Sequence, residues 1–242
     1  MQGYVYRARR AMSHAYQEAG NEARAWELER RADALYQRFN EHFWVPEIDN
    51  YALALQGADG HPAAVEASNQ GQALWGGIVT PARAKAVRDA LLDSARLWTG
   101  WGIRTLSYAA AAYNPFDYQS GAVWLHDNAL IAVGLRAYGF DAEASQVFTG
   151  LYEAATRFED YRLPELFAGF GRDEYGTPVR YPVACNPQAW SAGSLPYLFQ
   201  AILGLVPNAF EQRLYIVRPG LPSWLDWVTA NRPARADENQ VP

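Results

Sequence analysis

Apolar residues recur at helical spacing along most of the chain. The segment from Tyr4 to Ala19 is the first example, with an apolar residue at every third or fourth position and Gly20-Asn21 at its end. Between Glu22 and Phe43 one apolar stripe alternates with charged positions, which is typical of a helix with one buried face. The pattern predicts seven helices, at residues 4–19, 22–43, 67–75, 81–97, 121–138, 141–158 and 187–205.

The connections between these helices predict the architecture. Short turns alternate with long aromatic loops, at 99–120, 159–186 and after 206, and residues 51–55 could form a short strand. Helical hairpins stacked around an axis, with a ligand at one rim, have this layout. We therefore expect an all-α fold, an (α/α)6 toroid of the six-hairpin glycosidase type. Seven helices predict an incomplete barrel over residues 1–230, followed by a disordered polar tail at 231–242.

Composition and charge exclude several classes of function. The net charge of −5 comes from interspersed acidic and basic residues, so no basic face is available for nucleic acid. No apolar stretch of about 18 residues and no signal-peptide core occur, which predicts a cytoplasmic chain without a membrane partner. One cysteine, Cys185, and four scattered histidines predict no metal site and no cofactor, although calcium bound by carboxylates stays open.

The aromatic residues point to a ring-faced ligand such as a carbohydrate. Aromatics make up 14% of the chain, with nine tryptophans, several of them beside Gly, Asn or Gln. Amide side chains can bind neighbouring hydroxyl groups while indole rings pack on sugar faces. Candidate sugar-binding residues of this kind are Asn69, Gln70, Trp75, Trp101, Arg104, Gln188 and Trp190. In the alternative interpretation, the run around Trp101 is a tight turn whose tryptophans fill the core. This alternative suits Trp98 better than Trp101.

Two further segments place ionisable groups beside aromatic ones. Glu165 follows a proline in an aromatic loop, where partial desolvation would raise its pKa and suit it to acid or base catalysis. The alternative is an exposed carboxylate paired with Arg162 or Arg172. The run Trp124-Leu125-His126-Asp127 begins an apolar helix, and its Trp124, His126 and Asp127 are also candidates for the sugar site. Asp127 could instead be a helix cap.

Four ordered motifs carry a resemblance to a known family. They are Ala67-Ser68-Asn69-Gln70-Gly71, Gly100-Trp101-Gly102-Ile103-Arg104-Thr105-Leu106-Ser107, the segment from Gly121 to Ile131, and the segment from Tyr181 to Trp190. Together they resemble the bacterial amylo-α-1,6-glucosidase, or glycogen debranching, family over residues 2–228. The resemblance implies an (α/α)6 catalytic domain that hydrolyses α-glucans with inversion, using two carboxylates. It also implies that Glu165, in Leu-Pro-Glu-Leu, is the general base.

The sequence departs from that family at the other carboxylate. The family's general acid lies upstream of the segment that matches Gln2-Gly3-Tyr4-Val5, and Asp173 is not its counterpart. We therefore expect a glycoside hydrolase fragment without its acid and with little activity alone. The alternative is an inactive sugar-binding half-barrel or subunit, completed by a separate N-terminal polypeptide. A toroidal sugar epimerase would need paired histidines, which the sequence lacks.

The hydrolase hypothesis makes a geometric prediction. Seven of the candidate residues should converge on one concavity, namely Glu165, Trp101, Arg104, His126, Asp127, Gln188 and Trp190.

Overall fold

The computed structural model describes residues 1–229, and it is mainly helical. Its helices are α1 (Gln2–Glu18), α2 (Glu22–His42), α3 (Asn69–Gly76), α4 (Pro81–Leu92), α5 (Leu125–Ala137), α6 (Asp141–Ala155), α7 (Arg172–Tyr175) and α8 (Ala189–Leu203). All seven predicted helices are present, and the short α7 was not predicted. The tail expected at 231–242 lies outside the described residues.

Short antiparallel strand pairs connect the helices. The pairs are β1 (Trp44–Val45) with β2 (Asn50–Tyr51), β3 (Leu55–Gln56) with β4 (His61–Pro62), β5 (Val123–Trp124) with β6 (Leu166–Phe167), and β7 (Leu205–Asn208) with β8 (Arg213–Ile216). Two short 3₁₀ helices, Pro46–Ile48 and Glu159–Tyr161, lie in the loops. Three of the four pairs have strands of only two residues, so they are local ties between loops and not a sheet.

The helices form two layers of a toroid wall. In the first layer α1 packs on α3, α3 on α5, and α5 on α8; in the second layer α2, α4 and α6 follow their hairpin partners. Two glycines allow the close approach within the first layer. A Cβ atom on Gly76 would lie 2.6 Å from the Cα of Gly3, and one on Gly134 would lie 2.5 Å from the backbone nitrogen of Trp75. A larger side chain at either position would push neighbouring helices apart.

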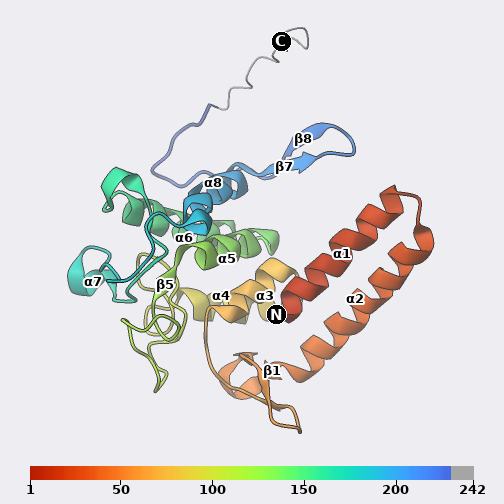
Figure 1. Cartoon of the computed structure of the whole chain (residues 1–242), viewed down its shortest axis with the longest axis horizontal. Coiled ribbons are helices and arrows are strands. Elements are labelled where there is room, and N and C mark those ends of the chain that lie inside the picture. The colour runs from red at the N-terminus through yellow and green to blue at the C-terminus, as the bar shows by residue number, and fades with distance from the viewer. Residues whose placement is uncertain (230–242) are drawn as a thin grey trace.

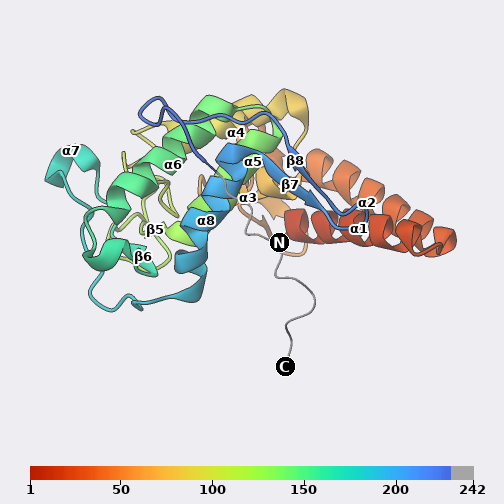
Figure 2. The same ribbon diagram turned by 90° about the horizontal axis from the view of Figure 1, so that it is seen from above.

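One apolar core fills the space between the two layers. Leu74 of α3, Leu135 of α5 and Phe148 of α6 are completely buried within it. Burial of this kind contributes roughly 1.5–3 kcal/mol for each large apolar side chain. The α1–α2 hairpin differs because it extends away from the other helices (Figures 1 and 2), and its Trp26 is 67% exposed.

The structure corrects four expectations about where elements begin and end. The helix expected at 81–97 ends at Leu92, because Asp93 adopts an extended conformation. The helix expected from residue 121 begins at Leu125, because the two preceding residues pair with β6 as strand β5. The strand expected at 51–55 is divided between β2 and β3, and part of the loop expected after 206 forms the β7–β8 hairpin. At the beginning of α5 a tertiary pairing overrides the local helical pattern.

Candidate active site

The β5–β6 pair brings Glu165 to the beginning of helix α5. Trp124 pairs with Leu166, so Glu165 stands next to the point where β5 becomes α5. Two backbone contacts fix its position from the other side: its N–H donates to the carbonyl oxygen of Cys185 at 2.9 Å, and its carbonyl oxygen accepts from Ser191 Oγ at 3.2 Å. Glu165 is thereby held between the first turns of α5 and α8.

Hydrogen-bond donors surround the carboxylate of Glu165. The hydroxyl of Tyr118 donates to Oε1 at 2.6 Å, and the backbone N–H of Cys185 donates to Oε2 at 3.2 Å. Nε2 of Gln188 lies 3.5 Å from Oε1. Both carboxylate oxygens therefore have a donor although the side chain is only 5% exposed.

These donors determine the protonation state of the site. The hydrogen bond from Tyr118 lowers the pKa of Glu165, assisted by Cys185 and Gln188, and together they outweigh the desolvation that acts in the other direction. The expectation of a raised pKa is therefore wrong, because the sequence shows the apolar surroundings but not the donors. In turn the same bond raises the pKa of Tyr118 to about 12. Glu165 is ionised at neutral pH and Tyr118 is protonated, which suits Glu165 to accept a proton.

Aromatic rings form one wall beside this carboxylate. His126 stacks on Trp190 at 4.6 Å between ring centroids, and Trp124 meets both rings edge-on at 5.6 and 6.1 Å. The rings of Tyr118 and Trp124 meet edge-on, with 4.7 Å between their centroids. Trp190 is 48% exposed, so this wall has a face open to a ligand. Burial lowers the pKa of His126, and the nearby charge of Glu165 opposes that effect.

Asp127 lies at the same helix start but faces helix α3. It is 7% exposed, and burial raises its pKa to about 6, while a hydrogen bond with the Ser68 side chain acts in the opposite direction. The residue before the helix is Trp124, whose side chain makes no capping hydrogen bond, and Asp127 is the third residue of α5. Asp127 is therefore not the N-cap residue of α5, although it lies in the first turn.

The predicted convergence of seven residues is wrong for three of them, namely Asp127, which faces α3, and the buried Trp101 and Arg104. Trp101 is 1% exposed and is covered by the guanidinium of Arg172, whose Cζ lies 4.2 Å from the ring centroid. It fills the core, so it is not available to a ligand. Arg104 is 3% exposed and lies over Tyr108 and Tyr113 in a separate cavity. The residues that the structure does bring together are Glu165, Trp124, His126, Gln188 and Trp190.

The sugar-binding candidates Asn69, Gln70 and Trp75 do not lie beside Glu165. Gln70 is 2% exposed, and its side-chain amide bonds only to backbone groups, which gives it a structural role. Trp75 contacts the ring of Tyr4 at a tilted angle, and its indole N–H donates to the hydroxyl of Tyr197 at 3.0 Å. Asn69 lines another cavity, of about 520 Å³, between α1 and α3.

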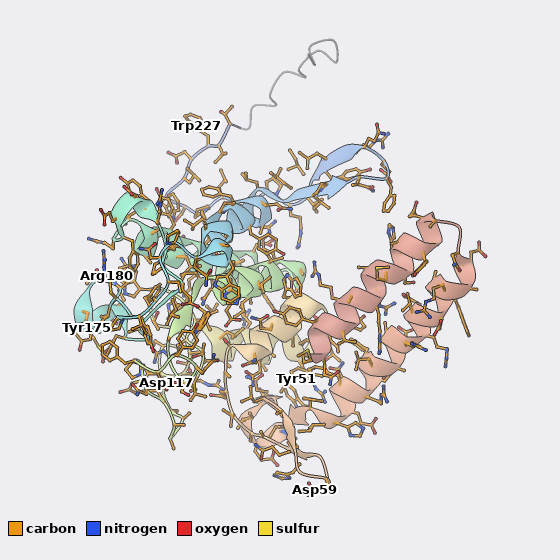
Figure 3. The ribbon with its side chains drawn as sticks, in the orientation of Figure 1. Tyr51, Asp59, Asp117, Tyr175, Arg180 and Trp227 are labelled. Atoms are coloured by element: carbon orange, nitrogen blue, oxygen red, sulfur yellow. The ribbon has the colours of Figure 1, made fainter. Side chains whose placement is uncertain are left out.

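Tyr118 is the functional residue that sequence reasoning missed. It lies in the loop before β5 and bonds to Glu165 across 47 positions of the chain. Its loop is conspicuous in the sequence for its aromatic content, but no local spacing connects a residue in it to Glu165. Figure 3 labels the nearby Asp117, which lies on the opposite side of the molecule from the α1–α2 hairpin.

Residues 1–229 contain no group of three or more His, Cys, Asp and Glu side chains arranged to hold a metal ion. In the same part of the chain, no helix combines the length and the apolar character needed to cross a membrane.

Comparison with known sequences identifies the family. Residues 1–175, which include Trp124, His126 and Glu165, match the mannosylglycerate hydrolase MGH1-like glycoside hydrolase domain. The chain belongs to this family. It is 27% identical over 172 residues to a mannosylglycerate hydrolase of Rubrobacter radiotolerans, covering 69% of this chain and 38% of that protein. The more specific resemblance to amylo-α-1,6-glucosidases is not supported by these matches.

Solved structures agree with the expected toroid. The GH63 mannosylglycerate hydrolase of Thermus thermophilus, solved in complex with glucose, superposes with a TM-score of 0.63 at 21% identity, over 82% of this chain and 46% of that one. The neutral trehalase Nth1 of Saccharomyces cerevisiae gives a TM-score of 0.65 at 15% identity, over 83% of this chain and 37% of that one. The predicted fold class, that of the (α/α)6 toroid glycosidases, is confirmed. The chain spans less than half the length of each of these relatives.

Proposed function

We propose that this chain carries the base side of a glycoside hydrolase active site, with Glu165 as the general base. The observation that supports this most is the ionised carboxylate of Glu165 beside an exposed aromatic wall. A base must be deprotonated at the working pH and must lie next to the bound sugar. The pKa of Glu165 meets the first requirement, and Trp190 with His126 provides the surface for the second.

The proposed reaction is hydrolysis with inversion. Glu165 removes a proton from a water molecule, and the water oxygen bonds to the anomeric carbon as the glycosidic bond breaks. A second carboxylic acid gives its proton to the leaving oxygen, so the products are a free sugar and an alcohol. In inverting enzymes the two carboxyl groups stand roughly 6.5–9.5 Å apart, which leaves room for the water.

The second carboxyl group has two candidate sources. Asp127 is at the same helix start as His126, and its pKa of about 6 suits a proton donor at mildly acidic pH. The other candidate is a carboxylate outside these 242 residues, in the part of the relatives' length that they do not span. The length of the relatives favours the second candidate, because this chain spans 38% of the R. radiotolerans protein.

For the substrate we propose a small glycoside of a hydroxy acid, of the mannosylglycerate type. The family and the names of the relatives support this choice. An α-glucan, which the sequence motifs favour, is the competing substrate, and trehalose is a third because a trehalase shares the fold. Each of these substrates offers a pyranose ring that could pack on Trp190.

The test compares these three substrates directly. The purified chain would be incubated with mannosylglycerate, trehalose and a limit dextrin, and the anomeric protons of the released sugar would be followed by NMR. Because the length of the relatives favours an acid outside this chain, we expect slow hydrolysis of mannosylglycerate by the chain alone, with a first product of inverted anomeric configuration. Retained configuration would contradict the role of Glu165 as base.

Binding measured by calorimetry separates the remaining outcomes. Binding of mannosylglycerate without hydrolysis would support the alternative of a sugar-binding unit that needs an acid from elsewhere. If the chain neither bound nor hydrolysed any of the three substrates, the proposal as a whole would be contradicted.

A further inference from the structure

A second cavity lies on the side of the molecule near α7, away from Glu165. It measures about 880 Å³ and lies between the residues that follow α4 and the helix α7, whose Tyr175 is labelled in Figure 3. Its lining includes Trp98, Arg104, Tyr108, Tyr113, Arg172 and Glu174. None of the residues around Glu165 lines it, so it is a different site.

Arg104 is a buried cation without a counterion in this cavity. Its residue is 3% exposed, and its guanidinium Cζ lies 5.6 and 5.4 Å from the ring centroids of Tyr108 and Tyr113. The single hydrogen bond of its side chain within the described residues is a long one, from Nη2 to the carbonyl oxygen of Trp98 at 3.4 Å. Its Nε is buried without any acceptor, and no carboxylate of residues 1–229 lies within ion-pair distance.

This arrangement is unfavourable unless something else completes it. A buried charge without a hydrogen-bonded partner loses its hydration and gains little in return, and a guanidinium stays protonated at neutral pH. The two tyrosine rings recover only part of the lost free energy, because a cation–π contact is weaker than an ion pair with two hydrogen bonds. The geometry therefore leaves Arg104 short of an anionic acceptor.

The other charges in the cavity restrict the kind of anion. Arg172 is already paired with Glu153 and stacks on Trp101, so its charge is compensated. Glu174 accepts a hydrogen bond from the backbone N–H of Gly171 at 3.1 Å. Glu174 and Asp173 are both exposed and line the cavity, and they would repel a dianion more strongly than a monoanion.

We propose that this cavity binds a small monocarboxylate, with the carboxylate on the guanidinium of Arg104 and the body of the ligand against Tyr108 and Tyr113. Arginine matches the planar geometry of a carboxylate with two parallel N–H donors. Tyr108 is 59% exposed and stands at the mouth, where its ring can contact the ligand. The site does not depend on the proposed hydrolysis at Glu165.

A titration of the whole chain with sodium acetate, followed by amide NMR, tests this site. Acetate is the simplest monocarboxylate, and sodium chloride at equal ionic strength controls for screening. We expect saturable shifts of the amides of Gly100, Tyr108 and Gly171, with a Kd in the millimolar range, about the affinity that a few polar contacts supply. Shifts that do not saturate, or that chloride reproduces, would overturn the proposal.

Two variants and a second anion make the result specific. Tyr108→Ala changes an exposed ring and should preserve the fold while weakening acetate binding about tenfold, whereas Glu165→Gln should leave it unchanged. Equal binding by Tyr108→Ala would contradict the proposed position of the ligand. Inorganic phosphate is the dianionic comparison, and tighter binding of phosphate than of acetate would overturn the assignment to a monocarboxylate.

Discussion

Glu165 and Arg104 are both buried charged residues, but their surroundings differ. Glu165 is 5% exposed and receives donors on both carboxylate oxygens, from Tyr118, Cys185 and Gln188. Arg104 is 3% exposed, and its side chain has one long hydrogen bond, to a carbonyl oxygen. The protein supplies what the first charge needs and leaves the second incomplete.

The comparison shows that burial alone does not define the role of a charged residue. Donors to Glu165 favour its ionised form, so the residue is ready to take a proton from water without any ligand. Arg104 has no corresponding acceptors among the described residues, and a bound anion would supply them. The hydrogen bonds within the protein therefore distinguish Glu165, which is suited to accept a proton, from Arg104, which is suited to bind an anion.

The largest expected effect comes from removing the charge of Glu165. Glu165→Gln keeps the size of the side chain but cannot accept a proton from water, so hydrolysis of mannosylglycerate should fall by about 10²–10⁴-fold while its binding is retained. Initial rates and calorimetric titration of both proteins measure the two effects. Glu159→Gln, an exposed glutamate six residues earlier, is the matched control and should leave both unchanged.

Asp127 is a third buried ionisable residue. Unlike Glu165 it has one side-chain partner, Ser68, and unlike Arg104 it does not line the cavity near α7. Its pKa in the folded chain is about 6, above the ordinary value of 3.8, so the folded state loses stability as pH rises from about 4 to above 6. Asp127→Asn should therefore raise the free energy of unfolding by about 2–3 kcal/mol at pH 8 and by little at pH 4. Urea denaturation at both pH values measures this.

A carboxylate with the opposite shift provides the control for that experiment. Backbone N–H groups of Gln119 and Ser120 lower the pKa of Asp117, so its contribution to stability is present at neutral pH and is lost as pH falls through its folded pKa. Asp117→Asn should destabilise at neutral pH. Stabilisation by both substitutions would show that the effect at Asp127 is not due to its burial.

Tyr118→Phe sharpens the account of how Glu165 is kept ionised. Loss of the hydroxyl removes the main cause of the lowered pKa, so the acidic limb of kcat/KM should move to higher pH. The rate should differ little from wild type at pH 8 and fall increasingly as the solution is acidified. A uniform reduction at every pH would instead indicate a purely structural role.

Arg104→Met tests the other side of the comparison and should have the smallest effect. Methionine keeps an apolar stem of similar length without the uncompensated charge, so stability should stay within about 1 kcal/mol of wild type. Denaturation with urea at pH 7 measures it. A loss of more than about 3 kcal/mol would show that the cation already has a partner in the free protein.

Helical periodicity predicted most of this fold because it is a local property. All seven expected helices are present, and their order indicated the toroid. Strands of two residues, such as β5 and β6, cannot be predicted in this way, because they exist only as a pairing between segments about 40 residues apart. That pairing is also what moves the beginning of α5 from residue 121 to Leu125.

The candidate site was predictable in part, for the same reason. Trp124 and His126, and separately Gln188 and Trp190, are neighbours in sequence at helix starts, and the fold brings both pairs beside Glu165. Tyr118 reaches Glu165 only through the tertiary structure, so neither the residue nor its effect on pKa was predicted.

The wrong prediction for Trp101 has a local physical cause. Trp101 lies in a turn held by Thr99, whose Oγ1 accepts from the N–H groups of Trp101 and Gly102, and this turn directs the indole into the core. Composition indicates that an indole is present, but it does not indicate which side of a turn the ring occupies.

The most direct test of the role of Glu165 as general base is chemical rescue of Glu165→Ala with sodium azide. Azide is already an anion and needs no base, so it can attack the anomeric carbon in the space that the side chain leaves. The account predicts that azide restores cleavage of mannosylglycerate and that the product is a glycosyl azide of inverted configuration. Two results would contradict it. One is hydrolysis by Glu165→Ala at the wild-type rate without azide, and the other is no rescue of the variant by azide although the wild-type chain is active.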